Sequence, residues 1–109
     1  MTGIGEVCQL CEVELVELEH WIAEAWVLPG GTVGAYVFEE VDVARVRLIV
    51  ELRRDLAIDD TAMPVVLHLL DQLYALRRRV KAMSAALDEL PPELRAALTA
   101  RLGRGEEEP

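Results

Sequence analysis

The stretch Thr61–Leu87, TAMPVVLHLLDQLYALRRRVKAMSAAL, decides how the rest of the chain is interpreted. Its apolar residues recur at alternating steps of three and four, which is the heptad pattern of a helix that pairs with another helix. Arg77–Arg79 and Lys81 fill the intervening positions of the second half, so the apolar seam there is too narrow to face a globular core. We predict a homodimer whose interface consists of Val66, Leu69, Leu73, Leu76, Val80, Met83 and Leu87.

The two ends of this helix differ in the width of their apolar face. In the first half a second apolar set, Leu67, Leu70 and Tyr74, widens the arc, so we expect the front of the helix to pack on its own domain. Thr61 is the expected N-cap, and Pro64 lies in the first turn, where its missing N–H costs little.

Length and composition indicate a small soluble protein. The 109 residues accommodate one small domain and an extension, with enough apolar content for a modest core. No apolar run approaches the roughly 18–20 residues of a membrane span, and the N-terminus lacks the basic region of an export signal. We therefore expect a cytoplasmic location and no membrane association. Two cysteines do not make a disulfide framework.

The formal net charge of −9 is distributed unevenly along the chain. Residues 1–44 contain nine acidic residues and no lysine or arginine, whereas residues 45–109 contain eleven residues of each sign. A surface built from the first part would repel a polyanion and attract a basic protein.

The chain reads as a mainly α protein with a small β wing. Helices are predicted over Glu6–Cys11, Glu14–Trp26, Val43–Leu56 and Glu93–Leu102, and a strand of a hairpin over Gly34–Phe38. Asp42 is the expected cap of the third helix, and Ala57–Asp60 is an acidic turn before the long helix. The predicted domains are a helix-turn-helix domain (1–60), the long helix (61–90), and a short helix with an acidic disordered tail from Gly103 (91–109).

This order of elements resembles the winged helix-turn-helix of the MerR superfamily. Gly5-Glu6-Val7 with Cys8 and Cys11 looks like its opening helix, and Glu24–Pro29 looks like the exit of its second helix. Gly34–Phe38 followed by Asp42-Val43 looks like its wing and the start of its third helix. Within the superfamily the chain is most similar to the chaperone-modulator (CbpM) family, in the segments WIAEAWV (21–27), YVFEE (36–40), DVARVRL (42–48), ELRRDL (51–56) and VLHLLDQLY (66–74).

That resemblance implies a non-enzymatic regulator. Proteins of the chaperone-modulator family bind and inhibit the J domain of a DnaJ-like (CbpA-type) co-chaperone, which blocks its productive encounter with DnaK. J domains present a basic helix, so the implied partner has the charge that residues 1–44 would attract.

The alternative is a MerR-type transcription regulator that binds DNA as a dimer. The MerR pattern places an arginine in the recognition helix, where this chain has Glu19, and another in the wing, where it has Val37. Arg45 and Arg47 remain as candidates for phosphate contacts, and two such contacts are too few against the surrounding acids. We therefore expect DNA binding to be weak or absent.

A third interpretation, a metal or redox enzyme, rests on Cys8 and Cys11 alone. Zinc needs four ligands, and only His20 and His68 remain, each on a different predicted helix. We expect both cysteines to be small buried residues. No partner for a histidine is spaced for catalysis, so we predict no catalytic residue, metal or cofactor.

Two groups of acidic residues are candidates for binding a basic partner. One lies on the predicted second helix, and the other surrounds the turn before the long helix, beside Leu56 and Ile58, which we expect to be exposed. The acids in these groups are Glu14, Glu17 and Glu24, and Glu51, Asp55, Asp59 and Asp60. Either group could instead be an ordinary solvated face, and Asp59 or Asp60 could cap the long helix.

Overall fold

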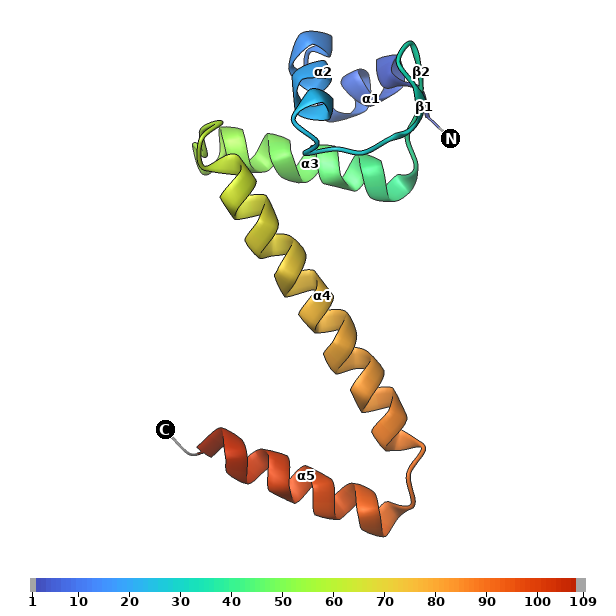
Figure 1. The fold of residues 1–109 in the computed structure, drawn as a ribbon, viewed down its shortest axis with the longest axis vertical. Helices are drawn as coiled ribbons and strands as arrows, with labels where there is room; N and C mark the ends of the chain where they lie inside the picture. The colour runs from blue at the N-terminus through green and yellow to red at the C-terminus, as the bar shows by residue number, and fades with distance from the viewer. Residues whose placement is uncertain (1, 108–109) are drawn as a thin grey trace. The chain divides into compact units, whose positions relative to one another are not determined.

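A computed structural model describes residues 2–107 of the protein, with side chains described for residues 2–103. The order of the elements confirms the predicted mainly α fold with a small β wing (Figure 1). The elements are α1 (Ile4–Cys11), α2 (Leu15–Ala23), β1 (Gly30–Thr32), β2 (Ala35–Val37), α3 (Glu40–Arg54), α4 (Met63–Asp88) and α5 (Pro92–Glu107).

The chain divides into two units, Met1–Leu67 and His68–Pro109, and the division falls inside α4. It lies after Leu67 rather than after residue 60, because Met63 and Leu67 of the first helical turns are buried in the core of the first unit. The front of α4 therefore packs on its own domain, as the wider apolar arc predicted.

The first unit is built around an apolar core to which α1, α2, α3 and the front of α4 contribute. α1 packs against both α2 and α3, and α1 and α2 lie on one side of α3 in Figure 1. No charged or polar residue of the described chain is buried. The buried residues are Val7, Cys11, Val13, Leu18, Trp21, Trp26, Val27, Phe38, Val46, Ile49, Leu52, Met63 and Leu67.

The second helix is shorter than the predicted Glu14–Trp26. Ala25 adopts a left-handed φ of 60°, and the Trp26 N–H donates back to the Trp21 carbonyl at 2.9 Å. Such a turn ends a helix and reverses the chain. The reversal directs Trp26 and Val27 into the core instead of leaving them on a continuing helix.

The wing is the predicted hairpin, with strands of three residues each. β1 and β2 are antiparallel, with Gly30 opposite Val37 and Thr32 opposite Ala35. Gly31 has a φ of 81°, and a Cβ there would lie 2.3 Å from the Ala35 carbonyl oxygen, so this position requires glycine.

Asp42 caps α3 from the third helical position rather than as its N-cap, and the predicted N-cap of α4, Thr61, is wrong. α3 begins at Glu40, with Glu39 as the N-cap, and Asp42 occupies the third helical position, where its Oδ2 accepts the Glu39 N–H at 2.9 Å. α4 begins at Met63, so Thr61 is not its N-cap; the Asp59 Oδ1 instead accepts the Ala62 N–H at 2.8 Å. In α3 Asp42 and Glu39 form a capping box, in which each side chain accepts the backbone N–H of the other, and in α4 the Asp59 carboxylate takes the place predicted for Thr61.

The second unit contains the rest of α4 and α5, and residues 89–91 separate the two helices next to the predicted break at Pro91-Pro92, with Pro92 as the first residue of α5. α5 continues through Glu107, so the prediction of a disordered tail is wrong for residues 103–107, and residues 108–109 lie outside the described residues. No side chain of residues 68–103 is buried.

Candidate functional site

In a winged helix-turn-helix, the second helix and the wing are the elements that can reach a DNA groove. Here α2 exposes Val16, at 76%, and the wing tip exposes Val33, at 86%. Glu19 is exposed on α2, and Val37 is half-buried on β2. Neither element carries a cation, because the first lysine or arginine of the chain is Arg45.

The two arginines considered for phosphate contact have different roles. The Arg45 Nε donates to the Trp26 carbonyl oxygen at 2.9 Å, so this half-buried arginine fastens the chain reversal after α2 to α3. Arg47 is exposed. Only Arg47 of the pair therefore presents its guanidinium freely on α3.

Two acidic residues of the turn between α3 and α4, Asp59 and Asp60, form contacts within the protein. Asp60 forms an ion pair with Arg53, and its Oδ2 lies 3.4 Å from the His20 Nε2. The His20 ring meets the Trp26 ring edge-on, with centroids 5.7 Å apart. Because Asp60 pairs internally and Asp59 caps α4, the interpretation of these two acids as structural residues is supported.

The remaining residues of this predicted group are available to a partner. Glu51 and Asp55 are exposed, and Leu56 is 66% exposed. Ile58 is half-buried, contrary to the expectation that it would be exposed. Its N–H donates to the Leu52 carbonyl at 2.9 Å, which draws the turn back over the end of α3.

The acids of α2 lie next to this turn. Glu14, Glu17 and Glu24 are all exposed. Glu14 and Glu17 share a hollow of about 380 Å³ with Arg53 and Arg54. These arginines supply counter-charge to Glu14 and Glu17. The prediction from the sequence did not include this counter-charge because it counted charges over residues 1–44 only. The His20–Asp60 contact also joins α2 to the turn, so the two predicted acidic groups occupy neighbouring elements.

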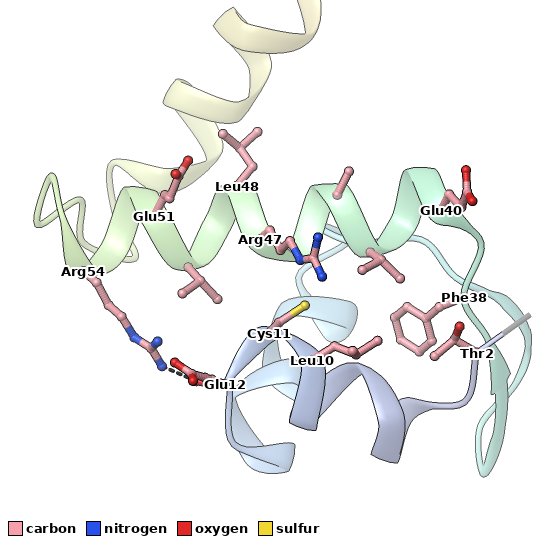
Figure 2. A pocket seen from close by; sticks show the side chains of 13 residues that line it. Thr2, Leu10, Cys11, Glu12, Phe38, Glu40, Arg47, Leu48, Glu51 and Arg54 are labelled. Carbon is pink, nitrogen blue, oxygen red and sulfur yellow. Dashed lines mark hydrogen bonds between the residues drawn. The ribbon is translucent and has the colours of Figure 1, made fainter.

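A groove between α1 and α3 was not predicted. It measures about 920 Å³, and Figure 2 shows Leu10 of α1 facing α3 while Arg47 is directed from α3 toward α1. At one end Arg54 donates to the Glu12 carbonyl oxygen. Leu10 is 56% exposed although it lies on a helix that faces the core. The only sign of this groove in the sequence was that α1 has an apolar residue, Leu10, that the core does not require.

Cys8 and Cys11 lie one turn apart on α1. Cys11 is buried as expected, whereas the expectation that Cys8 would be buried is wrong, since it is half-buried; both are free thiols. Burial raises the pKa of the Cys8 thiol, and the neighbouring Cys11 and Glu19 raise this pKa further. A protonated thiol is a poor nucleophile and metal ligand. Within residues 2–107, no three His, Cys, Asp or Glu side chains are placed to hold a metal ion.

The predicted dimer stripe follows one side of α4. Val66 and Leu87 are half-buried, and the five residues between them are 42–61% exposed. His68 is also exposed, next to the stripe. The Arg77 guanidinium lies 6.0 Å from the centre of the Tyr74 ring. Pairing of the stripe with a second copy stays a prediction.

A helix-turn-helix followed by a two-stranded wing, a third helix and a long helix defines a winged helix-turn-helix protein. A family model described as MerR HTH family regulatory protein matches residues 2–85. The chain therefore belongs to the MerR family of helix-turn-helix regulatory proteins. No curated protein and no solved structure matches it. Among the described helices, none is both long and apolar enough to span a membrane.

Proposed function

We propose that this MerR-family protein is a non-enzymatic chaperone modulator that binds and inhibits the J domain of a DnaJ-like co-chaperone. The observation that carries the proposal is the charge of α2 and the wing. These elements, which a DNA-binding relative would place on the duplex, carry no cation; α2 exposes Glu17 and Glu19, and its C-cap Glu24 is also exposed. The resemblance to the chaperone-modulator family supplies the identity of the basic partner.

The electrostatic argument against DNA is quantitative. Each phosphate that a protein neutralises releases counterions, and a specific DNA complex commonly makes about 6–10 such contacts. Among the residues considered for this role, Arg45 is engaged with the Trp26 carbonyl and only Arg47 is exposed. Arg53 and Arg54 also lie near Glu14 and Glu17, but Arg53 pairs with Asp60 and Arg54 donates to the Glu12 carbonyl. The exposed Arg47 alone is too few for the affinity that a DNA-binding regulator needs.

The same surface suits a basic protein. At the end of α3 the exposed Leu56 lies close in sequence to Glu51 and Asp55, and α2 adds its acids beside the adjoining turn. An apolar contact with a charged rim is the usual anatomy of a protein interface. The acids would also speed association with a cationic partner at low salt.

The proposed mechanism is occlusion. A basic J-domain helix that lies on this acidic surface is no longer accessible to DnaK, so stimulation of DnaK by the co-chaperone stops. No bond is made or broken by the regulator, and its effect depends only on affinity and concentration.

The competing function is that of a MerR-type transcription regulator. Its support is the family itself, whose members are described as regulatory proteins. It requires tight, salt-dependent binding to a palindromic operator, with the two helix-turn-helix domains of a dimer on successive major grooves.

The deciding experiment is a calorimetric titration of the full chain against the J domain of a DnaJ-like co-chaperone from the same cell, at low and moderate salt. We expect saturable binding that weakens as salt is added. Absence of binding by a folded protein contradicts the proposal, and nanomolar binding to a palindromic DNA selected from random sequence would establish the regulator of transcription instead.

The surface is mapped with the double variant Glu51→Lys/Asp55→Lys. Both acids are exposed, and Asp55, the C-cap of α3, caps through its backbone N–H rather than its side chain. Their reversal should therefore leave the fold intact and weaken J-domain binding more than tenfold. The matched control, Glu6→Lys/Glu89→Lys, changes the net charge equally at exposed positions on α1 and after α4. Equal affinities of the two variants would remove the end of α3 from the binding site.

A further inference from the structure

The groove between α1 and α3 is lined by apolar side chains that the core does not fully cover. Leu10 on α1 is 56% exposed, and Val43 and Val50 on α3 are half-buried. Leu10 faces α3 across the groove in Figure 2. Apolar residues gathered around a concave surface are typical of a binding site, so the groove is a candidate for one.

Helix α3 has a second face besides the one that packs in the core. Ile49 is buried in the core, and at 100° per residue Arg47 lies about 160° from it around the helix. Arg47 is directed toward α1 (Figure 2). Within about 60° of Arg47 lie further groove residues of α3, namely Glu40, Val43, Ala44, Glu51 and Arg54. The groove therefore follows this second face over the full length of α3.

The dimensions and the walls of the groove favour a helix as its occupant. Glu40 and Arg54 are the first and last of the 15 residues of α3, so the groove is about 21 Å long and accommodates about four turns of a second helix. An added β-strand requires an open sheet edge, and the backbone groups of α1 and α3 are already paired within these helices. A small ligand would remain largely exposed beside Arg47 and Glu51, whereas small-molecule sites bury most of their ligand.

The charges along α3 add a second requirement. Glu40, Arg47 and Glu51 are exposed and occur in the order acid, base, acid, at intervals of seven and four residues. These intervals correspond to about 10.5 and 6 Å along the helix axis. Arg54 is already engaged with the Glu12 carbonyl oxygen. A helix that matches this order carries an acidic residue between two basic residues at the same intervals, and all three fall on one of its faces.

This chain does not contain the matching segment. No two of its lysine and arginine residues are eleven positions apart, which is the total of the two intervals. Neither another segment of the same chain nor a segment of a second copy therefore supplies the complementary helix. The helix must come from a different protein.

We propose that the groove between α1 and α3 binds an amphipathic helix of a different protein. The apolar face of this helix packs on Leu10 and Val43. Its acidic residue pairs with Arg47, and its two basic residues pair with Glu40 and Glu51. The inference goes beyond the proposed function and stands without it, because Glu51 is the only residue of the surface proposed for the J domain that lines the groove.

The first test uses two synthetic peptides of about 14 residues, each held helical by a lactam bridge on its outer face. Both carry leucines and, on the same face, two lysines and one glutamate. In the matched peptide the glutamate lies between the lysines at the intervals of seven and four residues. In the control peptide the glutamate and one lysine are exchanged, so that composition and net charge are equal. Each peptide is also made in reverse order, because the helix can run in either direction along α3.

Fluorescence anisotropy measures peptide binding to the full chain. We expect the matched peptide, in one of its two directions, to bind at least tenfold more tightly than its control, and Arg47→Glu to abolish this preference. Arg78→Glu is the matched control variant, because Arg78 is exposed on α4 and its reversal changes the net charge equally. Equal affinities of the wild type for the matched and control peptides, or a preference that survives Arg47→Glu, would overturn the proposal.

A second variant keeps the proposal falsifiable if Arg47→Glu disturbs the fold. Ala44 lines the groove and is exposed, so Ala44→Trp fills the groove without entering the core. Circular dichroism verifies the helix content, and affinity for the matched peptide should fall at least tenfold. Unchanged affinity would place the peptide elsewhere on the protein. If the wild type binds no peptide and Ala44→Trp dissociates a dimer in sedimentation equilibrium, a second copy occupies the groove and the proposal is overturned.

Discussion

The two units of this chain differ in whether their apolar side chains are buried. The first unit buries thirteen apolar residues, from Val7 to Leu67. The second unit presents stripes of leucine, valine and methionine of the same quality and buries no side chain of residues 68–103. Burial of apolar area is the main favourable term in folding. The first unit can thus fold on its own core, whereas the helices of the second depend on what they pair with.

The largest expected effect tests the core of the first unit. Trp21 is 1% exposed at the centre of that core. Trp21→Ala should lower the free energy of unfolding by about 3–5 kcal/mol, because the substitution removes the transfer energy of the side chain and leaves a cavity. Urea unfolding followed by circular dichroism measures the change.

The control for this prediction lies on the same helix. Val16 is 76% exposed, and Val16→Ala should change the free energy of unfolding by no more than about 0.5 kcal/mol. Similar losses in both variants would mean that the first unit is not organised around Trp21.

The next effect concerns the second unit. Leu76 and Val80 are 56% and 54% exposed in the single chain, and pairing of the α4 stripe would bury them. Leu76→Asp/Val80→Asp should raise the dimer dissociation constant about a hundredfold, which corresponds to about 2.8 kcal/mol. Sedimentation equilibrium measures it. A monomeric wild type would contradict the predicted homodimer and show that the stripe has another partner.

The features that could be predicted from the sequence were those that follow from local sequence patterns. The steps of three and four from Val66 to Leu87 located α4, and Pro91-Pro92 located its end, since a periodic stripe and a helix breaker act through local geometry alone. The glycines before Tyr36 located the wing for the same reason. The acids of the first part of the chain are exposed on and beside α2 as predicted, although Arg53 and Arg54, which are distant in sequence, share a hollow with Glu14 and Glu17.

What could not be predicted depended on contacts between distant segments. Asp60 turns inward because Arg53 and His20 converge on it. Arg54 reaches Glu12, which is 42 positions earlier in the chain. The groove beside Leu10 exists only because α1 and α3 lie side by side. Each of these features requires the packed first unit, so no local pattern encodes it.

A smaller effect tests the inward role of Asp60. Asp60→Asn removes the charge that meets Arg53 and His20, and it should lower the free energy of unfolding by about 1 kcal/mol, the upper range for partly exposed ion pairs. Asp55→Asn is the matched control at an exposed position. If only Asp55→Asn affects stability in urea, the assignment of Asp60 to the fold is wrong.

The smallest predicted effect concerns the pKa of the Cys8 thiol, which reports whether the fold of the first unit is independent of the dimer. Burial raises the pKa of its thiol above the ordinary value of 9.0 in the folded chain. Because the folded state holds this proton more tightly than the unfolded state, the associated stability is present below pH 9.0 and is lost as the pH rises through the folded-state pKa. The thiolate is the reactive form, so alkylation of folded Cys8 should require a higher pH than alkylation in urea.

Alkylation by iodoacetamide, followed at Cys8 by mass spectrometry across pH, measures that difference. In Leu76→Asp/Val80→Asp the profile of the folded protein should match that of the wild type, because Cys8 lies in α1 and its burial owes nothing to the α4 stripe. A profile that moves toward the urea curve when the dimer is lost would mean that the first unit also needs the second copy. The contrast between a self-sufficient unit and a dependent one would then fail.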